Sequence, residues 1–133
     1  MLKVKTKIGK SRIHGTGLFA AQFIPKGTIT WEYSPTFDMD ISEKDINLMS
    51  SINKEYFIYY SYFDKKRNKF ILCADNQRFI NHTTSTKKEN IISTPDMDVA
   101  FRDIEIGEEL LCDYNKFDSD YFKRMNISIN KLI

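Results

Sequence analysis

Several short stretches of the chain alternate apolar and polar residues. The residues at every second position from Leu2 to Ile8 are separated by lysines, and Ile29, Trp31 and Tyr33 are separated by Thr and Glu. A period of two is typical of a strand with one buried face. Together with local enrichment in β-branched and aromatic residues, the pattern predicts strands over residues 2–8, 28–33, 56–63, 69–74, 91–92 and 97–102.

Two segments have helical features instead. Ser42 to Asp45 resembles a capping box and precedes apolar residues at helical spacing, which predicts one short helix over residues 43–51. Apolar residues recur every four positions from Phe117 to Ile129, with Asp118 or Ser119 as N-cap, which predicts a C-terminal helix laid on the body. Many short strands with few helices favour a mostly-β fold over a doubly wound α/β fold.

A weak internal repeat spans the chain. Ala20, Ile24 and Gly27 are matched by Ala100, Ile104 and Gly107 at a constant offset (104 − 24 = 80). Each set surrounds a turn signal, so the repeat suggests two related strand-turn-strand units.

Composition favours one globular domain over residues 1–133. With 41% hydrophobic residues the chain can bury one core, and a formal net charge of +2 provides no strong field for nucleic acid. The start lacks the apolar core of a signal peptide, and no run approaches the ~20 apolar residues of a membrane span. We therefore expect a soluble intracellular protein that binds neither nucleic acid nor membrane. Cys73 and Cys112 lie in apolar contexts typical of buried thiols in a reducing compartment.

Polar groups follow the apolar run Phe70 to Ala74 and need partners. Asn81 and His82 come shortly after it, and leaving such groups buried and unpaired costs about 1 to 3 kcal/mol each. The turn Gly15-Thr16-Gly17 lacks the third glycine of a dinucleotide fingerprint and the Gly-Lys-Ser/Thr of a phosphate loop. Backbone or a ligand other than a nucleotide phosphate must therefore satisfy the Asn-His pair.

Three stretches together resemble the SET-domain family of protein lysine methyltransferases. They are Gly15-Thr16-Gly17-Leu18-Phe19, Arg78-Phe79-Ile80-Asn81-His82 and Gly107-Glu108-Glu109-Leu110-Leu111-Cys112-Asp113-Tyr114. The resemblance covers roughly residues 3 to 122. It implies a β-clip fold of short strands in several small sheets, in which the segment of the third stretch threads beneath the loop after His82 as a pseudo-knot. The implied domain has a core of about 3–115, a variable insert over 40–60 and a helical tail over 116–133 that closes the substrate channel.

The resemblance also implies the site. S-adenosylmethionine would bind on one face and leave as S-adenosylhomocysteine, and a lysine of a protein substrate would enter an aromatic channel from the other. The implied catalytic residues are Tyr114 and Tyr33. The implied cofactor-binding residues are Gly15, Thr16, Gly17, Leu18, Arg78, Asn81, His82, Tyr114 and Phe117, and the implied channel residues are Tyr33, Cys112, Tyr114 and Tyr121. No metal is expected.

This chemistry needs an aromatic channel more than a charged one. Lysine has an unperturbed pKa of about 10.4, so very little of it is the neutral nucleophile near pH 7. Desolvation and a nearby cationic sulfonium lower that pKa, and a tyrosine hydroxyl orients the amine. A fixed carboxylate in the same place would stabilise the unreactive ammonium.

The sequence departs from the family pattern at two places. Residues 83–90 lack the Ser-Cys-x-Pro-Asn that often follows Asn-His and are about three residues longer, which suggests a looser cofactor loop. Cys112 stands where an aromatic residue is usual, which suggests space for further methyl groups on the product. No cysteine follows Tyr114, so the zinc-bound post-domain is absent from this sequence.

Two alternatives stay open beside the methyltransferase. One is a degenerate domain that holds the cofactor or a lysine peptide without turnover, and the other is a thiol hydrolase using Cys112 with His82. The expected partner is a protein with an accessible lysine, such as a histone or other basic tail, which the acidic residues 38–45 would attract. The expected location is the cytoplasm, or a host nucleus for a viral or effector protein, and the expected state is monomer or homodimer.

Overall fold

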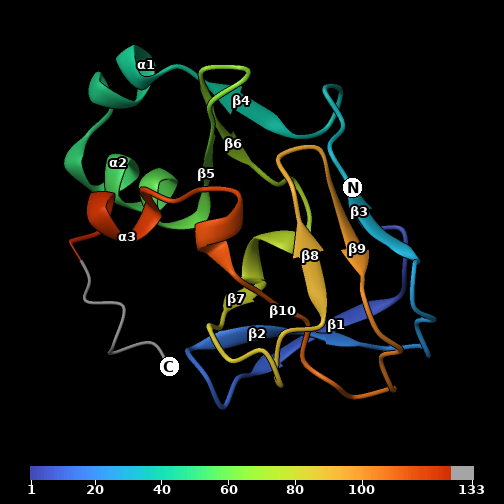
Figure 1. Cartoon of the computed structure of the whole chain (residues 1–133). Coiled ribbons are helices and arrows are strands. Elements are labelled where there is room, and N and C mark those ends of the chain that lie inside the picture. The colour runs from blue at the N-terminus through green and yellow to red at the C-terminus, as the bar shows by residue number, and fades with distance from the viewer. Residues whose placement is uncertain (127–133) are drawn as a thin grey trace.

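The computed structural model describes residues 1–126, which form ten short strands in four small sheets (Figure 1). The strands are β1 (Thr6–Lys10), β2 (Thr16–Ala20), β3 (Ile29–Glu32), β4 (Met39–Ile41), β5 (Tyr62–Asp64), β6 (Lys69–Leu72), β7 (Asn81–His82), β8 (Ile91–Ser93), β9 (Met97–Ala100) and β10 (Leu111–Cys112). The helices are α1 (Glu43–Asn47), α2 (Ser51–Tyr60) and α3 (Tyr121–Arg124), with 3-10 turns at Asn76–Phe79 and Tyr114–Lys116. The predicted mostly-β class is confirmed. None of the helices described here is long and apolar enough to cross a membrane.

The core lies where β2 meets β8, β9 and β10. The strands pair as β1-β2, β7-β10, β3-β9-β8 and β4-β6-β5. The fully buried cluster consists of Leu18, Ala20, Ile24, Ile91, Ala100, Ile104, Leu110 and Cys112. Its members come from both ends of the chain, so folding has to join segments that are distant in sequence.

The repeat predicted at an offset of 80 is a structural repeat. Ile24 and Ile104 exchange both backbone hydrogen bonds at 2.9 Å. Gly27 N donates to Ala100 O, and Gly107 N donates to Ala20 O. Both glycines have positive φ, 88° and 90°, a conformation that residues with a Cβ avoid. The two units therefore pair reciprocally, each closing the turn of the other.

The terminal segment threads between the two ends of the 83–90 loop, which confirms the predicted pseudo-knot. β10 pairs with β7 in parallel, with Leu111 opposite Asn81 and Cys112 opposite His82. On one side Thr83 N donates to Cys112 O, and on the other Asn90 N donates to Leu111 O. This enclosure places Tyr114 directly beside the Asn-His motif.

The strand predicted over residues 56–63 is wrong for most of its length. Ser50 caps α2 by accepting the Asn53 N–H at 3.3 Å, and α2 continues to Tyr60, leaving only β5 as strand. Aromatic residues favour strands on average, but here a capped start and ring packing between Tyr56 and Tyr60 at 4.8 Å favour a helix. The insert accordingly carries two helices, where one was predicted.

The remaining boundaries differ less. The Ser42 cap is confirmed, since its hydroxyl accepts Asp45 N–H at 3.1 Å, but α1 ends at Asn47. The first strand begins at Thr6, because Leu2 bridges to Trp31 of another sheet. The tail forms α3 with Asp120 at its N-cap, so neither predicted cap residue is correct, and Ile129 lies outside the described residues.

Candidate active site

Two adjoining cavities lie beside the Asn-His motif. The larger of the two is called the outer cavity and the smaller one the inner cavity. The outer cavity, of about 250 Å³, is lined by Ile13, His14, Gly15, Thr16, Tyr59, Tyr60, Arg78, Phe79, Ile80, Asn81, His82, Tyr114, Tyr121 and Phe122. The inner cavity, of about 60 Å³, is lined by Trp31, Tyr59, Tyr60, Ser61, Tyr62, Cys73, Gln77, Arg78, Ile80, Ser93, Thr94, Asp98, Tyr114, Phe117, Asp118 and Tyr121. Tyr114 lines both cavities and so lies at their junction, as do Tyr59, Tyr60, Arg78, Ile80 and Tyr121.

Asn81 anchors the glycine turn to the body. Its amide nitrogen lies 2.9 Å from His14 O, 3.1 Å from Thr16 O and 2.9 Å from a carboxylate oxygen of Glu109. Gly17 passes so close to Glu109 that a Cβ there would collide with the carboxylate. Asn81 therefore positions the backbone that lines the outer cavity, and its own amide protons are already used.

His82 offers one unused donor. Its Nδ1 accepts Tyr114 N–H at 3.0 Å, which places the proton of the neutral ring on Nε2. That Nε2 is buried and has no partner among residues 1–126. Burial lowers the pKa of His82, against the opposing effect of Asp113 and Glu89, so the ring is neutral near pH 7. The ring lies 4.7 Å from Phe122, so aromatic rings and a single N–H donor line this part of the outer cavity.

Tyr114 is held rigidly at the junction. Its hydroxyl donates to Ile80 O, and its ring meets Tyr121 edge-on at 5.0 Å. Burial raises the pKa of Tyr114, so its hydroxyl stays protonated at neutral pH. A fixed, neutral hydroxyl at this place orients a partner without taking a charge.

Helix α2 supplies a wall that the sequence did not predict. Tyr59 lies 2.7 Å from His14 Nε2 through its hydroxyl and accepts the Tyr121 hydroxyl at its carbonyl, also at 2.7 Å. Arg78 donates to the Tyr56 hydroxyl at 2.7 Å. The insert is thus tied to the motif residues, and the predicted strand over 56–63 concealed Tyr59 and Tyr60 as lining residues.

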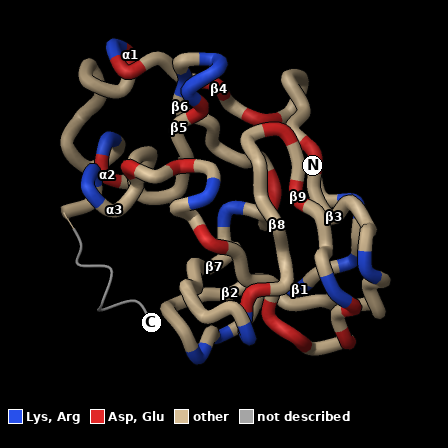
Figure 2. The backbone as a smooth tube through the Cα atoms, viewed as in Figure 1, with Lys and Arg blue, Asp and Glu red and all other residues tan. Residues whose placement is uncertain are grey.

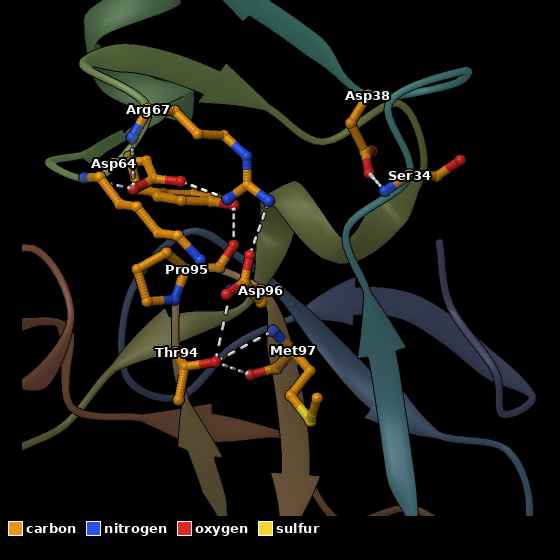
Figure 3. Close-up of polar contacts among 10 residues, drawn as sticks. Ser34, Asp38, Asp64, Arg67, Thr94, Pro95, Asp96 and Met97 are labelled. Atoms are coloured by element: carbon orange, nitrogen blue, oxygen red, sulfur yellow. Dashed lines mark hydrogen bonds and ion pairs between the residues drawn. The ribbon is translucent and has the colours of Figure 1, made fainter.

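Tyr33 lies outside both cavities, although it was predicted as a catalytic and channel residue. The Arg67 guanidinium stacks 4.0 Å above its ring, and the same guanidinium pairs with Asp64 and with Asp96 (Figure 3). Tyr62 instead faces the inner cavity, with its hydroxyl donating to Pro95 O at 2.7 Å. Of the two tyrosines, Tyr62 and not Tyr33 therefore lines the inner cavity, and a catalytic or channel role for Tyr33 stays a prediction.

The other predicted residues divide between the cavities and the core. Gly15, Thr16, Arg78, Asn81 and His82 line the outer cavity, whereas Gly17 and Leu18 do not. Phe117 lines only the inner cavity. Tyr121 lines both cavities, and Cys112 is fully buried in the core cluster and lines neither.

The 83–90 loop is tied down at its end. Glu89 pairs with Lys116 at 2.7 Å, and the Asn90 side chain bonds Glu109 O at 2.8 Å and Leu111 N at 2.9 Å. These contacts hold the end of the loop that encloses β10, whereas a looser cofactor loop stays a prediction.

The acidic stretch over residues 38–45 is not a uniform surface patch. Acidic positions gather near β4 and the N-terminus (Figure 2), but the Asp38 carboxylate is buried and accepts Ser34 N–H at 2.8 Å and Ala74 N–H at 3.0 Å. Asp38 therefore serves the fold. Among residues 1–126 no group of three or more His, Cys, Asp or Glu side chains is arranged to hold a metal ion.

The inner cavity contains an acid that the sequence reasoning missed. Asp98 is 3% exposed and lines it together with Gln77, Ser93 and Trp31. A signal was present, since Asp98 and Ala100 share one face of a strand and Ala100 is apolar.

Comparisons with known proteins agree with this geometry. A family model for the SET domain matches residues 15–115. A solved active Polycomb repressive complex 2 in the basal state is 26% identical over 84% of this chain and 15% of that chain, with a TM-score of 0.62. The Chaetomium thermophilum complex, autoinhibited and bound to S-adenosylmethionine, is 25% identical over 95% of this chain and 17% of that chain, with a TM-score of 0.64. The chain thus spans less than a fifth of those chains, and no curated protein sequence matches it.

Proposed function

The chain belongs to the SET-domain family, and on this premise we propose that it transfers a methyl group from S-adenosylmethionine to the ε-amino group of a lysine in a protein substrate. The observation that carries the proposal is the place of Tyr114. It stands at the junction of two aromatic cavities, on the threaded segment, with its hydroxyl fixed by Ile80 O.

The outer cavity suits the cofactor. Among residues 1–126 the one buried donor of this cavity without a partner, His82 Nε2–H, matches an acceptor nitrogen of adenine, and Phe122 offers a ring for stacking. Gly15 and Thr16 bring backbone to the same cavity, held there by Asn81. When bound, the sulfonium supplies an activated methyl group with its own leaving group. The chain has only to align an amine with it, and positioning of this kind supplies much of an enzyme's acceleration.

The inner cavity suits the lysine side chain. Tyr59, Tyr60, Tyr62 and Tyr121 surround it with rings that hold an alkyl chain, and burial keeps the hydroxyls of Tyr62, Tyr114 and Tyr121 protonated by raising their pKa values. Desolvation there lowers the pKa of the entering amine and favours the nucleophilic form.

The substrate is proposed to be a basic protein segment such as a histone tail. One similar structure was solved in complex with a trimethylated lysine mark of histone H3, at 25% identity and a TM-score of 0.61. Because Asp38 is buried, attraction of a basic tail would rest on the exposed acids of the insert, Asp40, Glu43 and Asp45.

The two alternatives lose support from the geometry. A degenerate binder would not need a rigidly held tyrosine at the junction of two cavities. A thiol hydrolase needs a thiolate, and burial raises the pKa of Cys112 well above its ordinary value while leaving the thiol inaccessible.

Labelled methyl transfer into a cell lysate and into purified histones, with identification of the modified lysine, tests the proposal. Calorimetric binding of S-adenosylmethionine is measured in parallel. Transfer to lysine that is lost in Tyr114→Phe with cofactor binding kept supports it. Cofactor binding without transfer to any protein supports the binding module instead, and transfer that is unchanged in Tyr114→Phe contradicts the site.

A further inference from the structure

Three polar side chains form a row across the β3-β9-β8 sheet. Asp98 of β9 pairs in register with Trp31 of β3 on one side and with Ser93 of β8 on the other. Directly opposed residues of antiparallel strands point to the same face. All three line the inner cavity, so the row forms part of its wall.

The row has unused hydrogen-bonding capacity. Trp31 Nε1 and Ser93 Oγ are buried without a partner among residues 1–126. Of the two Asp98 oxygens, only Oδ2 accepts a side-chain donor from the described residues, Gln77 Nε2. The cavity of about 60 Å³ has room for several water molecules, since one needs about 10 to 15 Å³. Water at the row would satisfy both orphaned groups and reach the free oxygen Oδ1.

We propose that Asp98 accepts the proton of the substrate ammonium through water held by Trp31 and Ser93. The inference rests on the proposed function and names the group that completes it. The proton leaves the lysine nitrogen and protonates the Asp98 carboxylate. The freed lone pair then forms the N–C bond to the methyl carbon as the C–S bond breaks and its electron pair returns to sulfur. After product leaves, Asp98 returns its proton to solvent through the same water.

The other groups that face the cavity are poor acceptors. The hydroxyls of Tyr62, Tyr114 and Tyr121 each donate to a carbonyl, and burial raises the pKa of all three. Asp118 pairs with Arg124. Burial raises the pKa of both nearby thiols, Cys73 and Cys112.

A carboxylate that stays charged would stabilise the substrate lysine as its unreactive ammonium, but Asp98 does not stay charged. Burial raises its pKa to about 7, against the neighbouring Ser93 hydroxyl and the hydrogen bond from Gln77, which lower it. A carboxylate with this pKa becomes neutral once it takes the proton, so it does not hold the amine as a permanent ion pair. A base with a pKa near the working pH is the most effective one.

Kinetics of Asp98→Asn against pH test the role, with the substrate found in the labelled-methyl assay. We expect kcat to fall roughly 10²-fold near neutral pH, with S-adenosylmethionine affinity unchanged. The loss should shrink when the lysine is replaced by its thialysine analogue, whose amine is more acidic. Asp96→Asn is the matched control, since Asp96 lies on the approach to the same strand, outside both cavities, and pairs with Arg67. A profile for Asp98→Asn that superimposes on the wild type overturns the proposal.

A second measurement needs no turnover and so separates this proposal from the proposed function. The probe is n-butylammonium, which mimics the end of a lysine side chain, with butan-1-ol as the uncharged comparison. We expect wild-type affinity for the ammonium to rise several-fold as the pH increases through about 7, no such step for the alcohol, and no step in Asp98→Asn. An absent step in the wild type refutes the role of Asp98. If the pH-dependent step in n-butylammonium affinity is present but no methyl transfer is found, only the proposed methyltransferase activity is refuted.

Ser93→Ala keeps the carboxylate and removes one anchor for water, which guards against a folding defect in Asp98→Asn. We expect a several-fold loss of kcat for Ser93→Ala, with the pKa of the Asp98 carboxyl at or above about 7 by carbon-13 NMR, since the Ser93 hydroxyl lowers that pKa in the wild type. Full activity of Ser93→Ala contradicts the water route.

Discussion

The two cavities that meet at Tyr114 are built in different ways. The outer one is lined by motif residues whose side chains hold backbone in place, as Asn81 holds the turn at Thr16. Rings from α2 and α3 line both cavities, and the inner one adds Tyr62 of β5 and Asp98 in its wall. The outer cavity therefore depends on backbone geometry, whereas the inner cavity depends on ring packing and on the charge state of Asp98.

The largest expected effect is at the junction. Tyr114→Phe removes the hydroxyl that is fixed by Ile80 O and leaves the ring packing against Tyr121. We expect kcat to fall by about 10² to 10³, since a preorganised hydroxyl acts on the transition state, with cofactor affinity within about threefold of wild type. Single-turnover methyl transfer and calorimetry measure the two quantities. Equal losses of kcat and of cofactor affinity would mean that the Tyr114 hydroxyl serves cofactor binding and not methyl transfer.

The next effect concerns the outer cavity alone. Asn81→Ala frees the carbonyls of His14 and Thr16 and leaves the Glu109 carboxylate without one donor. We expect a loss of about 1 to 3 kcal/mol in unfolding free energy and at least about tenfold weaker cofactor binding. Urea titration and calorimetry check this. Full cofactor affinity in a folded Asn81→Ala protein would mean that the turn needs no tether.

Asp98 of the inner cavity should make the unfolding free energy depend on pH. The pKa of Asp98 is raised from 3.8 to about 7, so the stability it contributes is full below about pH 4 and is lost as the pH rises through 7. Asp98→Asn lacks this slope. We expect it to gain about 2 to 3 kcal/mol relative to wild type between about pH 5 and pH 8. If the unfolding free energies of wild type and Asp98→Asn changed in parallel with pH, the Asp98 carboxylate would behave as an ordinary exposed one, and the prediction would be contradicted.

A small effect is expected at Tyr33, which tests the channel predicted from the sequence against the one proposed at the inner cavity. Tyr33→Phe keeps the ring under Arg67, so we expect kcat to change by less than about twofold. Tyr62→Phe removes the bond to Pro95 O within the inner cavity and should cost more, about tenfold. The reverse order would restore Tyr33 to the site.

Substitutions at Cys112 are expected to change stability first, because Cys112 lies in the core and lines neither cavity. Its side chain is fully buried in the core, so Cys112→Tyr overpacks that core and should cost about 1 to 3 kcal/mol before it alters methyl number. Cys112→Ala is the gentler test, read by mass spectrometry of the product. The earlier idea of space for further methyl groups stays a prediction.

Local sequence predicted the parts of the fold that local chemistry governs. The Ser42 cap, the strands around Trp31 and Ile71, and the glycine turns follow from hydrogen bonding, alternation and φ preferences of nearby residues. Helix α2 was missed because its rings favour a strand on average, and its cap and its contacts with His14 and Arg78 outweigh that preference.

By itself the sequence determined the family, through three motifs in order. The same motifs contain Asn81, His82 and Tyr114, which the structure brings together beside the two cavities. It also contained the repeat at an offset of 80, but not the fact that Ile24 and Ile104 pair with each other. Only the tertiary structure decided that Tyr62, and not Tyr33, lines the inner cavity and that Asp98 lies beside Trp31 and Ser93. The physical reason is that pairing and burial between distant segments set which side chains face a cavity and what their pKa values are, and no local pattern contains that information.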